Sequence, residues 1–531
     1  MATHRPQRTH ASTHDEADDG ITTETTPLLA ASSSPAVAAG DSDDAKALIS
    51  STPTPSASPN SAPTPAALPK TQILLLCYAR LIEPIAFFSI FPYINEMVLR
   101  NGHGSIAESD MGFYSGLIES LFSLTQMLVM VPWGRAADRL GRKPVLVSSL
   151  LGVAVATSLF GMARTIWQMI LFRCVAGVFA GSIVTVRAMI SENAGREHQA
   201  VAFSWFAVAG NLGIFIGPLL GGALADPARL YPRVFKGVWF FEEFPYALSS
   251  LLIGAVGLTA VLTSAFFVKE TLPRDKAQPD DDEVGAQAPR HRVSTRELLA
   301  APGVGIVLYN YGHAMLLAFS YTAVVPVFWA TRIDLGGLGF SPLQISLFMG
   351  LTGLSQAIWL LLVFPPLQRR LGTNGVMRLC GGAYPFFLGL MPLLNLVLRG
   401  HTSAGNTAFW VLAPTLLSLG PGVSMAFTGV QLALNDVSPS HETLGMLNAL
   451  ALTLTSGLRS FSPALFASLF AVGARNQFLH GYFVWVILFI LALGFTVSTR
   501  FLPETSEKQA ETGDRYEDGD EDEDSSDTLR D

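Results

Sequence analysis

The sequence is poor in charged residues. Only 14 % of its 531 residues are Asp, Glu, Lys or Arg, while 50 % are apolar and the mean hydropathy is +0.39. Soluble chains carry charge at roughly a quarter of their positions, because a large chain needs a charged exterior in water. The composition therefore excludes a soluble enzyme, a nucleic-acid-binding protein and a disordered scaffold, and it indicates an integral membrane protein.

Cysteine is also scarce. The three cysteines, Cys77, Cys174 and Cys380, all lie in apolar stretches, and their odd number and unpaired spacing argue against disulfides and a zinc site. The sequence has no cluster of His, Cys and carboxylates with ligand spacing and no Walker-type loop. We therefore expect no metal and no cofactor. No nucleophile, base and orienting group stand together, so we do not expect an enzyme.

Long apolar runs are missing at both ends. Residues 1–70 are rich in Thr, Ser, Pro and Ala and lack the apolar core of a signal peptide, and residues 504–531 are strongly acidic. Both segments are predicted to be disordered tails. The stretch E-T-T-P-L-L at 24–29 fits an acidic dileucine signal read by sorting adaptors; two exposed leucines are the simpler alternative.

Between the tails the sequence predicts about twelve membrane spans, each needing about 20 apolar residues. The first six cover 72–98, 112–133, 144–162, 166–190, 201–225 and 245–268. The second six cover 302–330, 342–366, 375–398, 408–435, 444–472 and 480–502. The fold class is therefore an all-α membrane protein with twelve transmembrane helices.

The spans divide into two bundles of six, residues 71–268 and 301–503, joined by a polar linker at 269–300. Lys and Arg are denser in the loops that share a side with the N-terminus, which places both termini and the linker in the cytosol. We expect a monomer without nucleic-acid partners.

A weak internal repeat supports this division. The sequence D-R-L-G at 138–141 follows the second span, and R-R-L-G at 369–372 follows the eighth. The sixth span ends F-V-K-E-T at 267–271, and the twelfth ends F-L-P-E-T at 501–505. Matches at equivalent positions indicate a duplicated six-helix unit, as secondary transporters often have.

Three motifs carry a family resemblance. The first, G-R-A-A-D-R-L-G-R-K at 134–143, is read as a short turn bracketed by two glycines. An ordinary basic cytosolic loop would explain its arginines but not their ordered spacing. The motif resembles the signature loop of the major facilitator superfamily, which helps to latch the two bundles on the cytosolic side. The resemblance implies a cytosolic gate formed by this loop together with the inner end of the fourth span. Its residues are Gly134, Asp138, Arg139, Gly141, Arg142, Arg187 and Glu192.

The second motif runs from Arg173 to Gly181 in the fourth span, with Gly177 and Gly181 four residues apart. It resembles the arginine and glycine pattern of helix four in this superfamily. An arginine within hydrocarbon normally faces a cavity or a partner. The alternative is that Arg173 lies near a helix end and extends its guanidinium to the membrane surface.

The third motif is a glycine stripe with an embedded proline in the fifth span. Glycines four residues apart allow close approach of another helix, and a proline favours a bend. A generic small-residue interface is the alternative. The stripe resembles the signature of antiporters in this superfamily, which implies export against an inward cation; its residues are Gly213, Gly217, Pro218, Gly221 and Gly222.

The resemblance can be narrowed within the superfamily. The stretches A-R-L-I-E-P-I at 79–85 and F-P-Y-I at 91–94 are similar to fungal members of the twelve-span drug:proton antiporter group. In the eleventh span Asn448, Ser456, Arg459 and Pro463 match the branch related to plant zinc-induced facilitators.

Charges inside spans are candidates for function. Glu83 lies deep in the first span, where burial disfavours a charged carboxylate and a nearby arginine favours it, so it is a candidate for binding protons. Arg80, one turn earlier, offers a simple intrahelical salt bridge as the alternative. Arg173 and Arg459 complete the set predicted to act in transport and proton coupling.

Several polar residues within spans are predicted to line a substrate path, although interhelical hydrogen bonds are the more ordinary role for each. They are Asn211, Tyr309, Asn310, His313, Gln356 and Gln431.

Taken together, these features predict a secondary transporter that exports small organic molecules, such as drugs or secondary metabolites, in exchange for protons. The proton gradient replaces a cofactor as the energy source. The expected location is the plasma membrane or the vacuolar membrane. Alternatives are a vacuolar metabolite carrier and a membrane receptor that does not transport.

Overall fold

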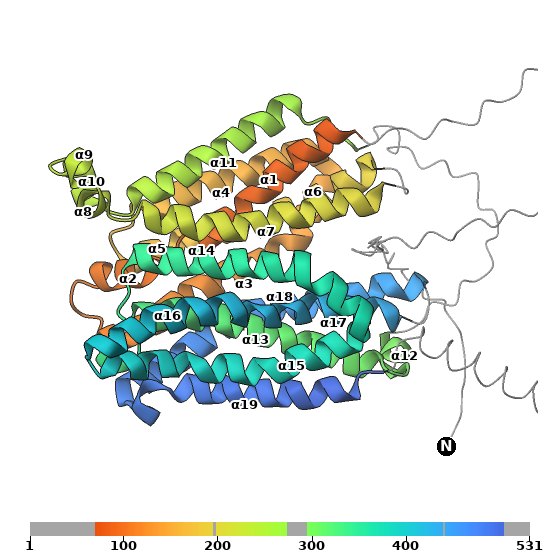
Figure 1. Cartoon of the computed structure of the whole chain (residues 1–531). Coiled ribbons are helices and arrows are strands. Elements are labelled where there is room, and N and C mark those ends of the chain that lie inside the picture. The colour runs from red at the N-terminus through yellow and green to blue at the C-terminus, as the bar shows by residue number, and fades with distance from the viewer. Residues whose placement is uncertain (1–68, 195–197, 273–294, 439–440, 504–531) are drawn as a thin grey trace, which may run out of the picture.

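The computed structural model describes residues 69–194, 198–272, 295–438 and 441–503, and every regular element in these ranges is helical (Figure 1). The predicted tails, the sorting signal and most of the predicted linker lie outside the described residues.

The N-terminal half contains the first eleven α-helices. They are α1 (Lys70–Phe88), α2 (Ile94–Asn101), α3 (Met111–Leu140), α4 (Arg142–Phe160), α5 (Ile166–Phe179), α6 (Ser182–Asn193), α7 (Gln199–Ala223), α8 (Pro227–Leu230), α9 (Pro232–Phe235), α10 (Trp239–Glu243) and α11 (Ala247–Phe267).

The main helices of the C-terminal half include a π-helical turn, η4, and a 3₁₀ turn, η5, that lie within spans. They are α12 (Thr295–Ala300), α13 (Val304–Ala330), α14 (Pro342–Ile358), η4 (Trp359–Val363), α15 (Phe364–Arg399), α16 (Ser403–Leu419), η5 (Gly420–Ser424), α17 (Met425–Asp436), α18 (His441–Asn476) and α19 (Phe483–Ser498).

The number of spans agrees with the sequence. Within the described residues, eleven helical stretches are long and apolar enough to cross a membrane, and one of them, Pro342–Arg399, has 58 residues. Since a span needs about 20 residues, this stretch is long enough to cross twice. It is broken at Gly372, whose φ of 68° and ψ of 171° are not helical. Counted as two spans, it brings the total to twelve.

The two halves repeat this break. Gly141 separates α3 from α4 with a φ of 106°, and Gly372 occupies the equivalent place in the C-terminal half, also with positive φ. Glycine alone adopts such a conformation at no steric penalty. The repeated R-L-G sequence therefore ends a span in the same way in both halves.

The extent of the turn after the second span was predicted wrongly. Residues 134–140 do not form a turn but continue α3 to Leu140, and only Gly141 leaves the helix. The physical reason is that the stretch R-A-A-D-R-L consists mainly of good helix formers.

Three predicted spans contain breaks that the sequence reading did not include. The first stops at Phe88 and resumes at Ile94 after a segment that contains Pro92, which cannot donate a helical hydrogen bond. The fourth breaks at Ala180 and Gly181, and the tenth passes through the 3₁₀ turn η5.

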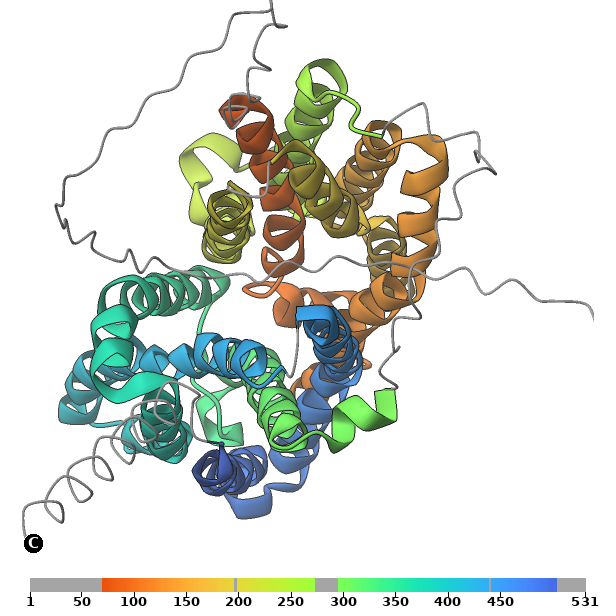
Figure 2. The same cartoon turned by 90° about the vertical axis from the view of Figure 1, so that its right-hand side faces the viewer.

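The helices run side by side between two ends of the molecule (Figure 1). We call the end that holds Lys70, Gly141 and Glu270 the basic end, and the end that holds α8 to α10 the opposite end. Viewed along the helices, the N-terminal and C-terminal halves form two groups that meet along α3 with α18 and α7 with α14 (Figure 2).

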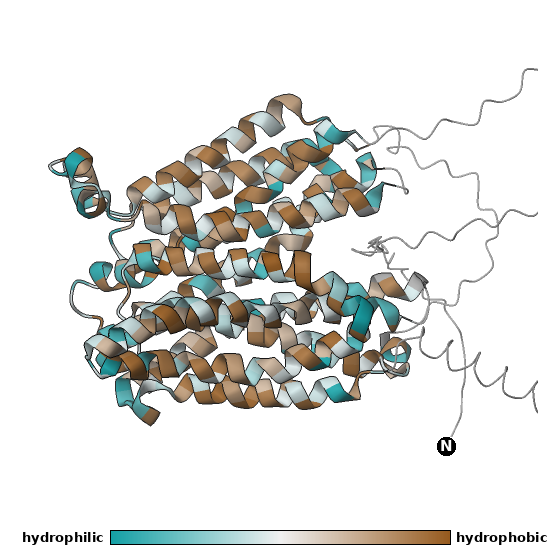
Figure 3. Ribbon diagram, viewed as in Figure 1, coloured by the Kyte–Doolittle hydropathy of each residue, from teal (hydrophilic) through white to brown (hydrophobic). Residues whose placement is uncertain are grey.

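Many large apolar side chains point outward from the spans, including Leu128, Phe266 and Phe386, which are 64 %, 75 % and 74 % exposed. Apolar residues cover much of the ribbon between the two ends (Figure 3). Such a surface is unfavourable in water and matches the hydrocarbon core of a bilayer.

Candidate transport site

Glu83 lies at the centre of the N-terminal half and is 5 % exposed. Its carboxylate accepts hydrogen bonds from Gln126 Nε2 at 2.6 Å and Ser182 Oγ at 3.0 Å. The Nη1 atom of Arg80, one turn earlier on α1, lies 3.9 Å from Oε2. Helices α1, α3 and α6 thus meet at one carboxylate.

A helix break helps to hold Gln126. The same Nε2 atom that donates to Glu83 also donates to the backbone oxygen of Ala180 at 2.9 Å. Ala180 lies between α5 and α6, where the helical hydrogen-bond ladder is interrupted. Sequence reasoning missed Gln126 and Ser182, although a polar residue within an apolar span is a usable signal.

Arg173 is buried, with 3 % of its surface exposed. Its guanidinium carbon lies 4.5 Å from the ring centre of Phe122 and 5.2 Å from that of Phe87. Aromatic rings stabilise a cation in an apolar setting by about 0.5–2 kcal/mol each. The side chain therefore packs inside the bundle and does not extend to the membrane surface.

Arg459 brings a second guanidinium to Phe87 from the other half. It lies on α18, with its guanidinium carbon 4.5 Å from the ring centre of Phe87. The ring of Phe87 thus contacts arginines of both halves, and the charge of Arg459 also interacts with Glu83.

Arg80 and Arg187 share another ring. Their guanidinium carbons lie 5.1 Å and 5.5 Å from the ring centre of Phe206 on α7. Arg187 also interacts electrostatically with Tyr311 of the C-terminal half. The structure therefore gathers most of the predicted charged residues into one central charged layer, which we define as Arg80, Glu83, Arg173, Arg187 and Arg459.

Three predicted gate residues, Asp138, Arg142 and Glu192, form a network at the basic end, whereas Arg187, also predicted for the gate, lies in the central charged layer. Arg142 pairs with Asp138 at 2.6 Å and with Glu192 at 3.0 Å. Glu270 accepts hydrogen bonds from the backbone nitrogens of Arg142 and Lys143 at 2.9 Å and 3.1 Å. In the described part of the chain these contacts all lie within the N-terminal half. Arg139 is exposed.

The Glu270 carboxyl has a lowered pKa. Partial burial acts to raise its pKa, but backbone N–H groups of Leu272, Lys143 and Arg142 donate to the ionised form and outweigh burial. Its contribution to stability is therefore complete at neutral pH and is lost as the pH falls below the usual value of 4.5 and through the folded-state pKa.

Substituting Gly141 by alanine is expected to destabilise the protein by about 1–3 kcal/mol, because the backbone conformation here is essentially restricted to glycine. The φ and ψ angles are 106° and 150°, and an added Cβ would lie 2.7 Å from Glu270 Oε2. Thermal unfolding in detergent measures this loss of stability as a lower melting temperature. Gly134→Ala is the control, since its Cβ would meet its nearest atom at 3.7 Å. Equal melting temperatures for the two variants would contradict the prediction.

The glycine stripe packs α7 against α1. A Cβ at Gly213 would lie 2.8 Å from the oxygen of Leu81, and one at Gly217 would lie 2.9 Å from that of Ile85. Gly221 continues the stripe, while Gly222 faces α14 of the other half. Pro218 is accommodated within α7, which stays continuous from Gln199 to Ala223. Close packing of α7 thus supports the part of α1 that carries Glu83.

Two of the predicted path residues face α19. Asn310 Nδ2 donates to the oxygen of Ser498 at 3.3 Å, and His313 Nε2 lies 2.9 Å from the oxygen of Leu491. Helix α19 lies on the side of the C-terminal half away from the N-terminal half (Figure 2). Their contacts are therefore the interhelical hydrogen bonds that were the alternative for these residues.

The other four predicted path residues are spread over the two halves. Gln431 donates to Asn448 Oδ1 at 3.0 Å, which joins α17 to α18. Tyr309 is 55 % exposed, and its ring lies 5.5 Å from that of His313. Asn211 on α7 is exposed, and Gln356 on α14 is half-buried.

The two halves pack tightly toward the opposite end. A Cβ at Gly116 on α3 would lie 2.5 Å from the oxygen of Pro463 on α18, and Ser120 Oγ accepts from the backbone nitrogen of Ala464 at 2.8 Å. A Cβ at Gly222 would lie 2.5 Å from the oxygen of Pro342.

Ion pairs between the halves add to this closure. Arg475 lies 3.7 Å from Asp110, and Arg332 lies 3.9 Å from Glu108. Toward the basic end the ribbons of α7 and α17 stand apart (Figure 1). The conformation is therefore closed at the opposite end.

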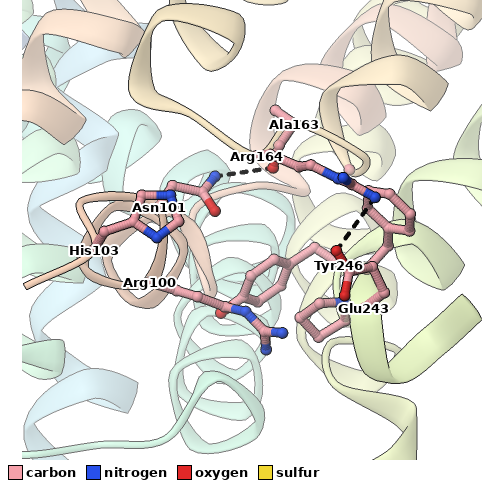
Figure 4. A pocket seen from close by; sticks show the side chains of 10 residues that line it. Arg100, Asn101, His103, Ala163, Arg164, Glu243 and Tyr246 are labelled. Atoms are coloured by element: carbon pink, nitrogen blue, oxygen red, sulfur yellow. Dashed lines mark hydrogen bonds and ion pairs between the residues drawn. The ribbon is translucent and has the colours of Figure 1, made fainter. Parts of the chain in front are cut away.

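Two cavities lie outside the central charged layer. One, of about 210 Å³, is at the opposite end, where Arg164 pairs with Glu243 at 3.2 Å and Asn101 donates to the oxygen of Ala163 at 3.0 Å (Figure 4). The other, of about 500 Å³, is apolar and lies among η4, α15, α16 and η5. Within the described residues, no three His, Cys, Asp or Glu side chains gather to hold a metal ion.

Twelve apolar spans in two halves that meet around a buried charged layer define a multi-pass membrane transporter. The chain belongs to the Major Facilitator Superfamily, whose family model matches residues 76–463. This confirms the resemblance and the fold class derived from the sequence.

Individual relatives agree with this assignment. The chain is 47 % identical to the protein named Efflux pump azaK of Aspergillus niger, over 82 % of this chain and 89 % of the relative. It is 28 % identical to Protein ZINC INDUCED FACILITATOR-LIKE 1 of Arabidopsis thaliana, over 82 % of this chain and 91 % of the relative. The solved D-xylose-proton symporter shares the fold, with a TM-score of 0.62 and 12 % sequence identity. The match covers 83 % of this chain and 99 % of the symporter.

Proposed function

We propose that this transporter exports small organic molecules in exchange for protons by alternating access. The name of the Aspergillus niger relative supports efflux. The observation that carries proton coupling is Glu83, a carboxylate almost sealed from solvent yet held by two neutral donors with an arginine at 3.9 Å. Such a group can change protonation when its surroundings change.

We also propose that the basic end faces the cytosol, in the plasma membrane or the vacuolar membrane. Lys70 and the cluster Arg139, Arg142 and Lys143 lie at this end, as the positive-inside rule requires of cytosolic loops. Both termini are then cytosolic. The conformation described above is closed toward the outside, and the central charged layer receives substrate from the cytosol.

The test is transport by the full chain in vesicles made acidic inside. Ethidium, a neutral coumarin and carboxyfluorescein sample cationic, neutral and anionic probes. At least one probe is expected to enter about tenfold faster than in protein-free vesicles, a change of about 1.4 kcal/mol in the barrier. Entry is expected to stop when a protonophore removes the gradient. Equal entry with and without the protonophore would contradict proton exchange.

A further inference from the structure

Glu119 is a second carboxylate within the membrane-spanning part, and the mechanism proposed above does not use it. It lies on α3 and is 2 % exposed. In the portion of the chain that the structure describes, its carboxylate forms no ion pair and accepts no hydrogen bond, although the charge of Arg173 acts on it. A buried ionisable group in a membrane span is costly and is usually functional.

A column of polar side chains leads from Glu119 toward Glu83. Ser123 and Gln126 follow Glu119 at positions i+4 and i+7, which places all three on one face of α3 over about 10 Å of helix. The hydroxyl of Ser123 is buried and has no hydrogen-bond partner in the described residues. Gln126 ends the column by donating to Glu83 at 2.6 Å.

The two carboxylates have opposite surroundings. Glu83 accepts two hydrogen bonds, one from Gln126 and one from Ser182. Glu119 accepts none in the described part, so an ionised carboxylate there would lose its hydration without replacement. The charged group that acts on Glu119 is Arg173 on α5, and Arg173 in turn interacts with Tyr93 before α2, Cys174 on α5 and Arg459 on α18. Glu83 is therefore held by two donors, whereas Glu119 has none among the described residues.

The position of Glu119 also determines which side of the membrane it can meet. It lies between Gly116 and Ser120, two of the residues through which α3 packs on α18. When the halves separate at the opposite end, α18 leaves this part of α3. Such a separation would open Glu119 to water at that end, whereas Glu83 lies nearer the basic end.

We propose that Glu119 is a second proton-binding site, loaded from the outside, which supplies protons to Glu83. This rests on the proposed proton exchange. The proton passes from outside water to the Glu119 carboxylate, then through the Ser123 hydroxyl and intervening water to Glu83, and leaves at the basic end. Only O–H bonds form and break, and Gln126 positions Glu83 without carrying the proton.

The test compares Glu119→Gln with Glu96→Gln, a control that removes a carboxylate from a surface pair with Arg229. Vesicle assays follow both proton-driven uptake and exchange of labelled for unlabelled probe without a gradient. Glu119→Gln is expected to slow proton-driven uptake about tenfold and to keep probe exchange, because only proton supply is lost. Ser123→Ala is expected to slow uptake less, and Glu96→Gln is expected to leave both rates unchanged.

Glu119→Asp separates proton binding from a structural role, because it keeps a titratable carboxyl and is expected to retain proton-driven uptake. If Glu119→Gln keeps uptake while Glu83→Gln loses it, the second site is refuted and the proposed function stands. If Glu119→Gln and Glu83→Gln both keep proton-driven uptake, proton exchange through Glu119 and Glu83 is refuted as well. If the Asp and Gln variants lose uptake and probe exchange alike, Glu119 is structural and the inference fails.

Discussion

Glu83→Gln is expected to reduce proton-driven transport by about a hundredfold, the scale on which removal of a proton-transfer group acts. Glutamine has nearly the same size and can still accept from Gln126 or Ser182, so the packing of α1, α3 and α6 is retained. It cannot bind a proton, and it removes the negative charge that faces Arg80 at 3.9 Å. Probe exchange without a gradient is expected to continue, since this step needs no net proton movement.

The measurement is initial uptake into acid-loaded vesicles over a range of internal pH. The native chain is expected to respond to pH, and Glu83→Gln is expected to give a flat, slow rate. Glu96→Gln serves again as control because its partner Arg229 lies at the surface, where such pairs contribute little. A pH response equal to that of the native chain would assign proton coupling to another group.

Gly116→Ala and Gly222→Ala are expected to shift the conformational equilibrium by about tenfold to a hundredfold toward the state that is open at the opposite end. At both positions the new Cβ would lie 2.5 Å from a backbone oxygen of the other half, which cannot rotate away. Overpacking of this kind costs about 1–3 kcal/mol. The penalty falls only on the closed state, since the halves separate there in the open one.

Spin labels at Trp167→Cys and His401→Cys, both exposed at the opposite end, report this shift as a longer distance between the halves. The native cysteines are first replaced by alanine. Gly382→Ala is the control, because nothing lies within 4 Å of its added Cβ. If the distance distribution is unchanged in both Gly116→Ala and Gly222→Ala, the closed state tolerates the extra methyl group and the prediction is wrong.

The fold could be predicted from the sequence because each span is a local property: about 20 apolar residues bounded by polar ones. The repeat was visible for the same reason, since R-L-G followed by a new span recurs in each half. Breaks such as Phe88 to Ile94 were missed because apolar composition continues across them. Hydropathy does not register a change in backbone angle.

The site was only partly predictable. Arg80 and Glu83 are one turn apart, so their pairing follows from helix geometry. The donors to Glu83 come from positions 43 and 99 residues away, and only the packing of α1, α3 and α6 brings them together. Asn310 and His313 illustrate the same limit, because nothing local indicates that their helix face meets α19. Glu119 was detectable as an ionisable residue inside a span.

The central charged layer is divided unequally between the halves: Arg80, Glu83, Arg173 and Arg187 come from the N-terminal half, and only Arg459 comes from the C-terminal half. The C-terminal half contains the distorted turns η4 and η5 within its spans. The consequence is evolutionary. A related chain can vary its C-terminal half and still keep four of the five charged side chains of this layer.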